Sequence, residues 1–218
     1  MRQVIIVISV VVFCLGVAGC MTAGIGHSPQ VLSPGQTEYS FGLIAFVPQV
    51  QTAMPFGNIY YDFRRGLWHG TEAELRLMAG DAPPVGVRLG ANTALVEGPV
   101  LVTATAEAGA AIAPGTQSGT INGVAPDAKP LSIGIEAAAG LLVGSPELYA
   151  GVQLSYEADF YGPGVQQNLL PAIILGASFG GQKLHVVPEI GLIVSPWPYF
   201  YLPAWCAYLT VGVGFSLR

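Results

Sequence analysis

The fold class is decided by the C-terminal stretch 207–217, Ala207-Tyr208-Leu209-Thr210-Val211-Gly212-Val213-Gly214-Phe215-Ser216-Leu217. Every second residue from Ala207 to Leu217 is apolar, and the residues between them are Tyr, Thr, Gly or Ser. A β-strand points successive side chains to opposite faces and so separates these two sets, whereas a helix would mix them. The stretch therefore predicts a β-strand with one apolar face.

The same alternation with a period of two recurs along the chain. It predicts about ten strands, with eight as the alternative, near residues 36–47, 56–65, 70–79, 84–96, 100–113, 131–144, 147–160, 169–180, 183–195 and 205–217. The links at 66–68, 97–99, 145–146 and 181–182 are tight, whereas 48–55, 114–130, 161–168 and 196–204 are long and 80–83 is intermediate. Short turns on one side and longer loops on the other are typical of antiparallel transmembrane barrels, and an even strand number places both termini on the short-turn side.

The composition favours a barrel in a membrane. The chain is 52% hydrophobic and only 10% charged, whereas soluble domains are about 25% charged. After the first twenty residues, no apolar run reaches the roughly 18 residues of a spanning helix. Strands in lipid must close into a ring because lipid offers no hydrogen bonds. A soluble β-sandwich also alternates, but the scarcity of charge and the aromatic residues near strand ends favour the barrel. No Lys/Arg cluster is present, so we expect no nucleic-acid partner.

The N-terminus has the pattern of an export signal. Arg2 precedes an apolar stretch, Val4 to Val17, that is short for a membrane span, and residues 1–19 therefore predict a signal peptide. The sequence Val17-Ala18-Gly19-Cys20 resembles the lipobox of bacterial lipoproteins. That resemblance implies cleavage before Cys20 and acylation of this residue, and Met21 in place of the Asp of an inner-membrane retention signal favours the outer membrane. The alternative is an ordinary signal peptide with a chance cysteine.

The mature chain divides into two parts. Residues 20–35 hold Gly, Pro and small residues without periodicity, which predicts a flexible, lipid-anchored tether on the periplasmic side of a Gram-negative outer membrane. Residues 36–218 form the predicted barrel domain. Its end resembles the assembly signal on the last strand of outer-membrane barrels, at Thr210, Gly212, Phe215 and Leu217. The departures are Leu217, where an aromatic is commoner, and the trailing Arg218. The resemblance implies the barrel-assembly machinery as a partner during biogenesis, beside outer-membrane lipid.

Nearly every charge in the predicted strands falls on the face opposite the apolar one. These residues are predicted to line the lumen: Glu38, Asp62, Arg64, Glu72, Glu74, Arg76, Arg88, Glu107, Glu136, Glu157, Asp159, His185 and Glu189. A ten-stranded ring is narrow enough for side chains to fill, so these charges can pair into a network that plugs the barrel. The nine acids outnumber the three arginines in this set, and such an excess would attract cations into a narrow pore. Both interpretations remain open at this point.

The sequence holds no metal-ligand spacing, phosphate loop or nucleotide fingerprint, so no metal and no cofactor are expected. Three histidines, His27, His69 and His185, leave a lipid-modifying barrel hydrolase as an alternative, although sequence cannot pair them with a nucleophile. The aromatic loop 195–203 is typical of an interfacial belt and, less often, of a ligand-binding loop. The prediction is a non-enzymatic outer-membrane β-barrel lipoprotein with a structural or surface-interaction role. A narrow cation-preferring pore is the second prediction.

Overall fold

A computed structural model describes residues 27–48, 56–80, 85–113, 132–161, 164–181, 183–194 and 205–217. Among these residues, no helix is long and apolar enough to cross a membrane. The eleven strands are β1 (Thr37–Pro48), β2 (Phe56–Trp68), β3 (Thr71–Gly80), β4 (Val85–Val96), β5 (Leu101–Ala113), β6 (Ser132–Gly144), β7 (Leu148–Tyr161), β8 (Gly164–Ala177), β9 (Phe179–Gly180), β10 (Leu184–Val194) and β11 (Trp205–Leu217).

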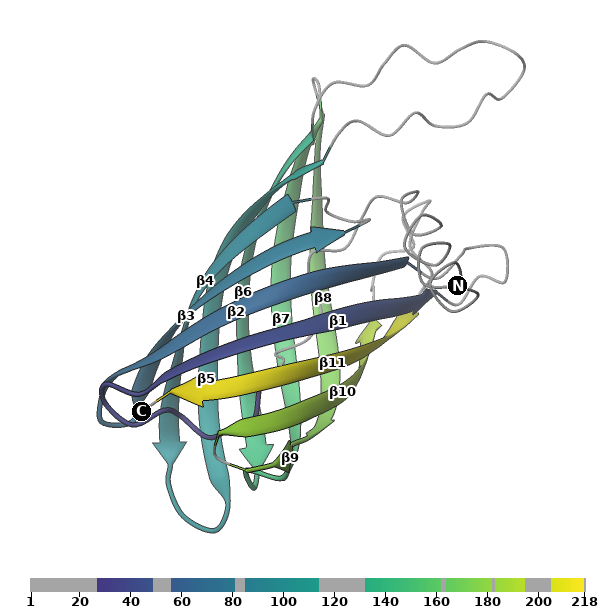
Figure 1. Cartoon of the computed structure of the whole chain (residues 1–218). Coiled ribbons are helices and arrows are strands. Elements are labelled where there is room, and N and C mark those ends of the chain that lie inside the picture. Colours follow the sequence, from purple (N-terminus) through teal and green to yellow (C-terminus); the bar gives the residue numbers. More distant parts are fainter. Residues whose placement is uncertain are drawn as a thin grey trace, which may run out of the picture.

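The strands form a closed antiparallel barrel, as predicted. Each pairs with its neighbour in chain order, β8 pairs with β10, and β11 pairs with both β10 and β1 to close a ring of ten strands. The two-residue β9 pairs only with the start of β10 and lies outside this ring. Figure 1 shows the steeply tilted strands, with the C-terminus at the end where the short turns lie.

The expected strand 169–180 differs from the observed one at both ends. It begins earlier, at Gly164, whose partner is Tyr161 at the end of β7. Residues 164–167 lack a repeated alternation of apolar and polar residues, so their sequence does not predict a strand. At the other end the ladder with β7 stops at Ala177, and the Ser178 backbone N–H donates to the Glu147 carbonyl at 2.9 Å. The chain resumes as β9, where Gly180 has a φ of 128° that favours glycine.

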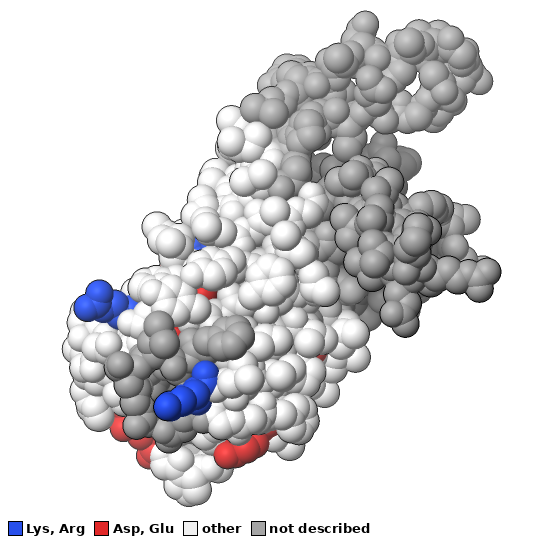
Figure 2. Space-filling model, viewed as in Figure 1, with Lys and Arg blue, Asp and Glu red and all other residues white. Residues whose placement is uncertain are grey.

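The outer face of the barrel is apolar. Phe41, Leu43, Leu89, Ile173 and Ile190, from four different strands, each expose 51–63% of their surface. In Figure 2 the described surface is mostly uncharged, and the prominent charged side chains gather at the lower end, where Figure 1 places the short turns. A charge on the lipid face near mid-membrane costs about 2–4 kcal/mol. This distribution is therefore the one that a lipid environment requires.

The interior has two unlike sides. Most buried charges face inward from β1 to β6, with Glu157 and Glu189 on β7 and β10 as the exceptions. Most large buried apolar side chains face inward from β6 to β10, and Ile44, Tyr60 and Met78 on β1 to β3 join the same cluster. The large buried apolar side chains on β6 to β10 are Leu142, Tyr149, Leu170, Ile174, Val187 and Ile193, each 0–3% exposed. The alternation indicates a lumen of charges and small residues, but the second half of β8, from Leu169 to Leu175, is apolar on both faces. Part of the barrel is therefore filled by a hydrocarbon core.

Three inward-pointing rings lie over glycines of the neighbouring strand. Tyr60 lies over Gly42, His185 over Gly214, and Tyr149 over Gly176, and a Cβ atom at any of these glycines would overlap the ring. Each glycine thus leaves room for a ring over its strand, and the rings of Tyr149 and His185 reach Glu189 and Glu38 on the strand beyond. The Tyr149 hydroxyl donates across Gly176 to Glu189 of β10 at 3.1 Å.

We predict that Gly176→Ala destabilises the barrel by about 1–3 kcal/mol, because the added methyl displaces the Tyr149 ring and breaks its hydrogen bond to Glu189. Urea unfolding of the refolded protein in detergent micelles measures the change. Gly181→Ala is the matched control, since a Cβ there meets nothing within 4 Å. Equal unfolding midpoints for the two variants would contradict this account.

Candidate functional site

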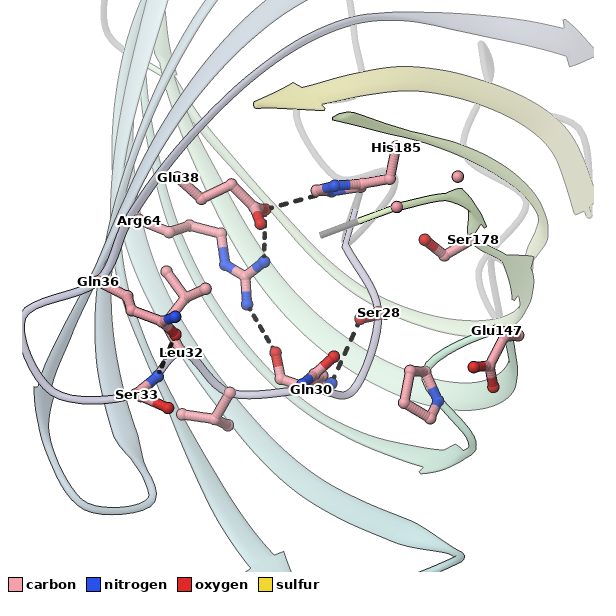
Figure 3. Close-up of a pocket in the computed structure, with 14 residues that line it drawn as sticks. Ser28, Gln30, Leu32, Ser33, Gln36, Glu38, Arg64, Glu147, Ser178 and His185 are labelled. Carbon is pink, nitrogen blue, oxygen red and sulfur yellow. Dashed lines mark hydrogen bonds and ion pairs between the residues drawn. The ribbon is translucent and has the colours of Figure 1, made fainter. Parts of the chain in front are cut away.

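The N-terminal residues 27–36, here called the strap, enter the barrel at its short-turn end and contact the lumen. The Leu32 backbone N–H donates to Glu72 at 2.8 Å. Arg64 donates to the Gln30 carbonyl at 3.1 Å, and the Thr103 hydroxyl donates to the Pro29 carbonyl at 2.5 Å. Figure 3 shows the strap crossing the mouth with Arg64 pointing toward it. Lumen side chains thus bond the backbone of residues 29, 30 and 32, within the segment predicted as a tether.

The first ion-pair group of the lumen is centred on Arg64 of β2. Its guanidinium donates to Glu38 of β1 at 2.9 Å and to Glu72 of β3 at 2.8 Å. These side chains come from three adjacent strands: Glu38 is the cross-strand partner of Arg64, and Glu72 lies diagonally from it, opposite Gly66. The neighbouring Arg65 points outward and is exposed. The adjacent pair Arg64-Arg65 thus divides between the lumen and the surface.

The second group is centred on Arg76 of β3. It binds both carboxylate oxygens of Asp62, at 2.6 and 3.0 Å, and Glu74 at 3.1 Å. Its guanidinium also lies over the Tyr60 ring, 5.1 Å from the centroid. Two parallel bonds to one carboxylate fix the orientation of both partners. The side chain is 1% exposed, so this fork is removed from water.

The third group is less well satisfied. Arg88 of β4 lies 2.8 Å from Glu136 of β6 and 3.5 Å from Glu107 of β5. Both Glu107 oxygens are buried without a hydrogen-bond partner, as is one oxygen of Glu136. A buried carboxylate without donors is costly. The unpaired oxygens of Glu107 and Glu136 can accept a hydrogen bond from a further donor or bind a cation.

The other predicted lumen residues are His185, which extends the first group through Glu38, and Glu157, Asp159 and Glu189. Glu157 and Glu189 are buried, and His185 lies 3.6 Å from Glu38. Asp159 pairs through its backbone with Gly134 and Gln166, but its side chain lies outside the described residues.

The two predicted terminal signals are placed only in part. Cys20 lies outside the described residues. The predicted assembly signal lies in the second half of β11, where the backbones of Thr210, Gly212, Phe215 and Leu217 pair with β1. Gly212 is buried, and the other three side chains lie outside the described set.

Sequence reasoning missed several members of the interior. His27 was placed in the tether, yet it is 2% exposed and lies 3.2 Å from Glu74. Asn92 donates to Glu72 and Glu74, at 2.9 and 3.1 Å. Asn92 and Thr103 fall on the inward face by alternation, so periodicity could have found both. His27 stands in a segment without periodicity, and nothing local marks it.

A cavity of about 400 Å³ opens at the short-turn end. Strap residues such as Ser28 and Gln36 form one wall, Glu147 and Ser178 stand opposite, and Glu38, Arg64 and His185 also line it (Figure 3). Within the part of the chain that the structure describes, no group of three or more His, Cys, Asp or Glu side chains could hold a metal ion. The lining is mostly polar, so the cavity suits water or a polar molecule.

The closed ring, the apolar outer face and the charged interior define a small transmembrane β-barrel of the outer-membrane type. Among solved structures, the chain is similar to Ail, the attachment invasion locus protein of Yersinia pestis, with 9% identity, 84% of this chain and 99% of that chain covered, and a TM-score of 0.31. It is similar to Neisserial surface protein A, with 8% identity, 83% and 95% coverage, and a TM-score of 0.33.

A third similar structure is the translocator domain of the autotransporter NalP from Neisseria meningitidis, with 10% identity, 98% and 95% coverage, and a TM-score of 0.39. No protein-family model and no curated protein matches this sequence. Likeness at these identities and TM-scores carries no information about activity. The functional argument therefore rests on the side chains of this barrel.

We predict that Arg76→Met destabilises the barrel by about 3–5 kcal/mol, because it leaves Asp62 and Glu74 as buried charges without their main cation. Urea unfolding in micelles, followed by gel mobility of the folded form, measures the loss. Arg65→Met removes the same charge from an exposed position and is expected to change stability by less than about 0.5 kcal/mol. A similar loss in both variants would show that net charge, not the buried fork, is responsible.

Proposed function

We propose that this chain is an outer-membrane β-barrel lipoprotein whose barrel is closed to ions and whose role is structural or a surface interaction. The observation that supports this most is the filled interior. Three arginine-centred groups occupy one side of the lumen, buried apolar side chains occupy the other, and the strap lies across the short-turn mouth. A barrel filled by its own side chains and plugged by its own chain acts through its loops and its membrane surface.

The proposed lipid anchor is consistent with one orientation of the barrel. In the described chain the strap begins at His27 within the short-turn mouth, seven positions after the lipobox cysteine, Cys20. A segment of that length spans at most roughly 25 Å. An acyl chain on Cys20 would then enter the leaflet beside the short turns. The short turns would face the periplasm, and the long links would face outward, where a surface interaction would occur.

The closed-barrel proposal predicts no ion conductance. The mature chain, refolded and inserted into a planar bilayer under a salt gradient, should give no reproducible current steps, because ion-pair groups and buried apolar side chains occupy the described lumen. Protease protection of the same preparation checks that the barrel has inserted. Reproducible cation-selective steps from inserted protein would refute closure.

A narrow cation-preferring pore is the second candidate, and a specific observation favours it. Among the described residues, eight buried acids face three buried arginines, and Glu107 has no hydrogen-bond donor on either oxygen. In a pore, Glu107→Gln and Glu136→Gln would lower the preference for cations over anions. In a closed barrel the same variants change only stability. The reversal potential under the salt gradient separates the two cases.

We expect the barrel to stay in the membrane even without the proposed lipid on Cys20. Cys20→Ala should leave the protein in the outer-membrane fraction after washing with alkaline carbonate, because the apolar belt, with residues such as Leu43 and Leu89 more than half exposed, supplies the attachment. Mass spectrometry of the unaltered chain tests acylation of Cys20 directly. Release of the Cys20→Ala protein by the wash would contradict a transmembrane barrel.

A further inference from the structure

The strap is held in the lumen by a histidine whose hydrogen bonds can be counted. His27 is 2% exposed, so both ring nitrogens need partners within the protein. Its Nδ1 lies 2.9 Å from the Ser28 carbonyl oxygen. A carbonyl oxygen only accepts hydrogen bonds, and Nδ1 must therefore carry a hydrogen.

The second nitrogen, Nε2, faces two groups. It lies 3.2 Å from a carboxylate oxygen of Glu74 and 3.3 Å from the amide nitrogen of Asn92. That amide nitrogen has two hydrogens, and they are directed to Glu72 at 2.9 Å and to Glu74 at 3.1 Å. The opposite orientation of the Asn92 amide would turn its oxygen toward two carboxylates. Asn92 therefore has no hydrogen left for Nε2. Glu74 accepts hydrogen bonds from Arg76 and Asn92 as an ionised carboxylate, and in that form it can only accept, so Nε2 must also carry a hydrogen.

We propose that His27 is a buried imidazolium whose proton latches the strap across the barrel mouth, so that loss of this proton at higher pH loosens the strap. Without the proton, a lone pair on Nε2 faces the Glu74 carboxylate with no donor between them. The imidazole leaves this position and the strap moves with it. The proposal does not depend on whether the barrel conducts.

The charges around the ring favour the protonated form. Glu72 and Glu74 of β3 face the His27 ring, and Arg64 of β2 stands nearby. Arg76 binds the other oxygen of Glu74. The neighbouring residues of β4 and β5 are the neutral Asn92 and Thr103. Burial and the charge of Arg64 lower the pKa of His27. The hydrogen bond to Glu74 and the charges of Glu72 and Glu74 raise this pKa by more, so the net shift is upward.

The direction of the pH effect follows from this sign. A raised pKa in the docked state means that the latch contributes its full stability below the ordinary histidine value of about 6.5, and loses it as the pH rises through the docked value. The strap is therefore docked in acid and loosened in alkali. Loosening also removes the strap partners of Arg64, Glu72 and Thr103 and opens the wall of the cavity at the mouth.

Amide hydrogen exchange of the refolded barrel, read by mass spectrometry over the strap peptide, tests the proposal. The reporting groups are the backbone N–H of Leu32, which donates to Glu72, and that of Gly35, which donates to Gly66. After correction for the intrinsic pH dependence of exchange, protection of the strap should fall about tenfold for each pH unit between the ordinary histidine value of about 6.5 and the raised docked value, and should level off above it. Protection of the ring strands should stay constant over the same range.

Two variants at the same position separate the proton from the shape of the side chain. His27→Gln keeps an N–H that can donate to Glu74 at every pH, so its strap protection should no longer depend on pH. His27→Leu has no donor, and its strap should exchange rapidly at all pH values. His69→Gln is the control, because that ring is 87% exposed beside Glu97 and should leave the pH dependence intact.

A direct measurement covers the case in which His27→Leu does not fold. Nitrogen-15 chemical shifts of the histidine rings in the unaltered protein report whether both nitrogens of His27 carry hydrogens near neutral pH. Imidazolium shifts that persist above those of His69 support the latch. A neutral His27 ring near pH 7, strap protection that is constant up to about pH 9, or an unchanged pH dependence in His27→Gln would each overturn it.

Discussion

The structure depends on one constraint, which is that lipid offers neither hydrogen bonds nor solvation for charge. Backbone groups can be satisfied there only in a closed ring of strands, and the ring here closes between β1 and β11. The same constraint excludes charge from the outer face. The charged side chains of the strands consequently meet inside a narrow barrel, where they must find one another. The ion-pair network is thus a consequence of the membrane as much as a feature of the fold.

Within that barrel the network is uneven. Arg64 and Arg76 are well bonded to carboxylates from neighbouring strands, whereas Glu107 has only a distant ion pair with Arg88. Buried ion pairs gain little net stability because desolvation offsets attraction, but breaking one is expensive. The apolar side of the interior supplies the packing that the charged side lacks, and the glycines that seat Tyr60, Tyr149 and His185 let the two sides interlock. The interior therefore behaves as a core, with a polar half that fixes its register.

The strap completes the charged half. Arg64, Glu72 and Glu74 each have two partners in the ring and one in the strap, so β2, β3 and the N-terminal segment share one set of hydrogen bonds. This sharing connects the segment that precedes the barrel to the charge state of the lumen. It also makes a segment without regular secondary structure part of the interior.

The sequence by itself determined the class of fold, because lipid imposes a period of two on every strand and the alternation is local. It also placed Glu38, Arg76 and Glu136 on one face, since burial in a barrel follows parity along each strand. Only the tertiary structure decided which arginine meets which acid, because the pairing of Arg88 with Glu136 depends on strands 48 residues apart. The tertiary structure also decided that β8 turns apolar side chains inward and that His27 enters the lumen. A strand apolar on both faces and a segment without periodicity give no local sign of what they contact, and only closure of the ring brings those contacts together.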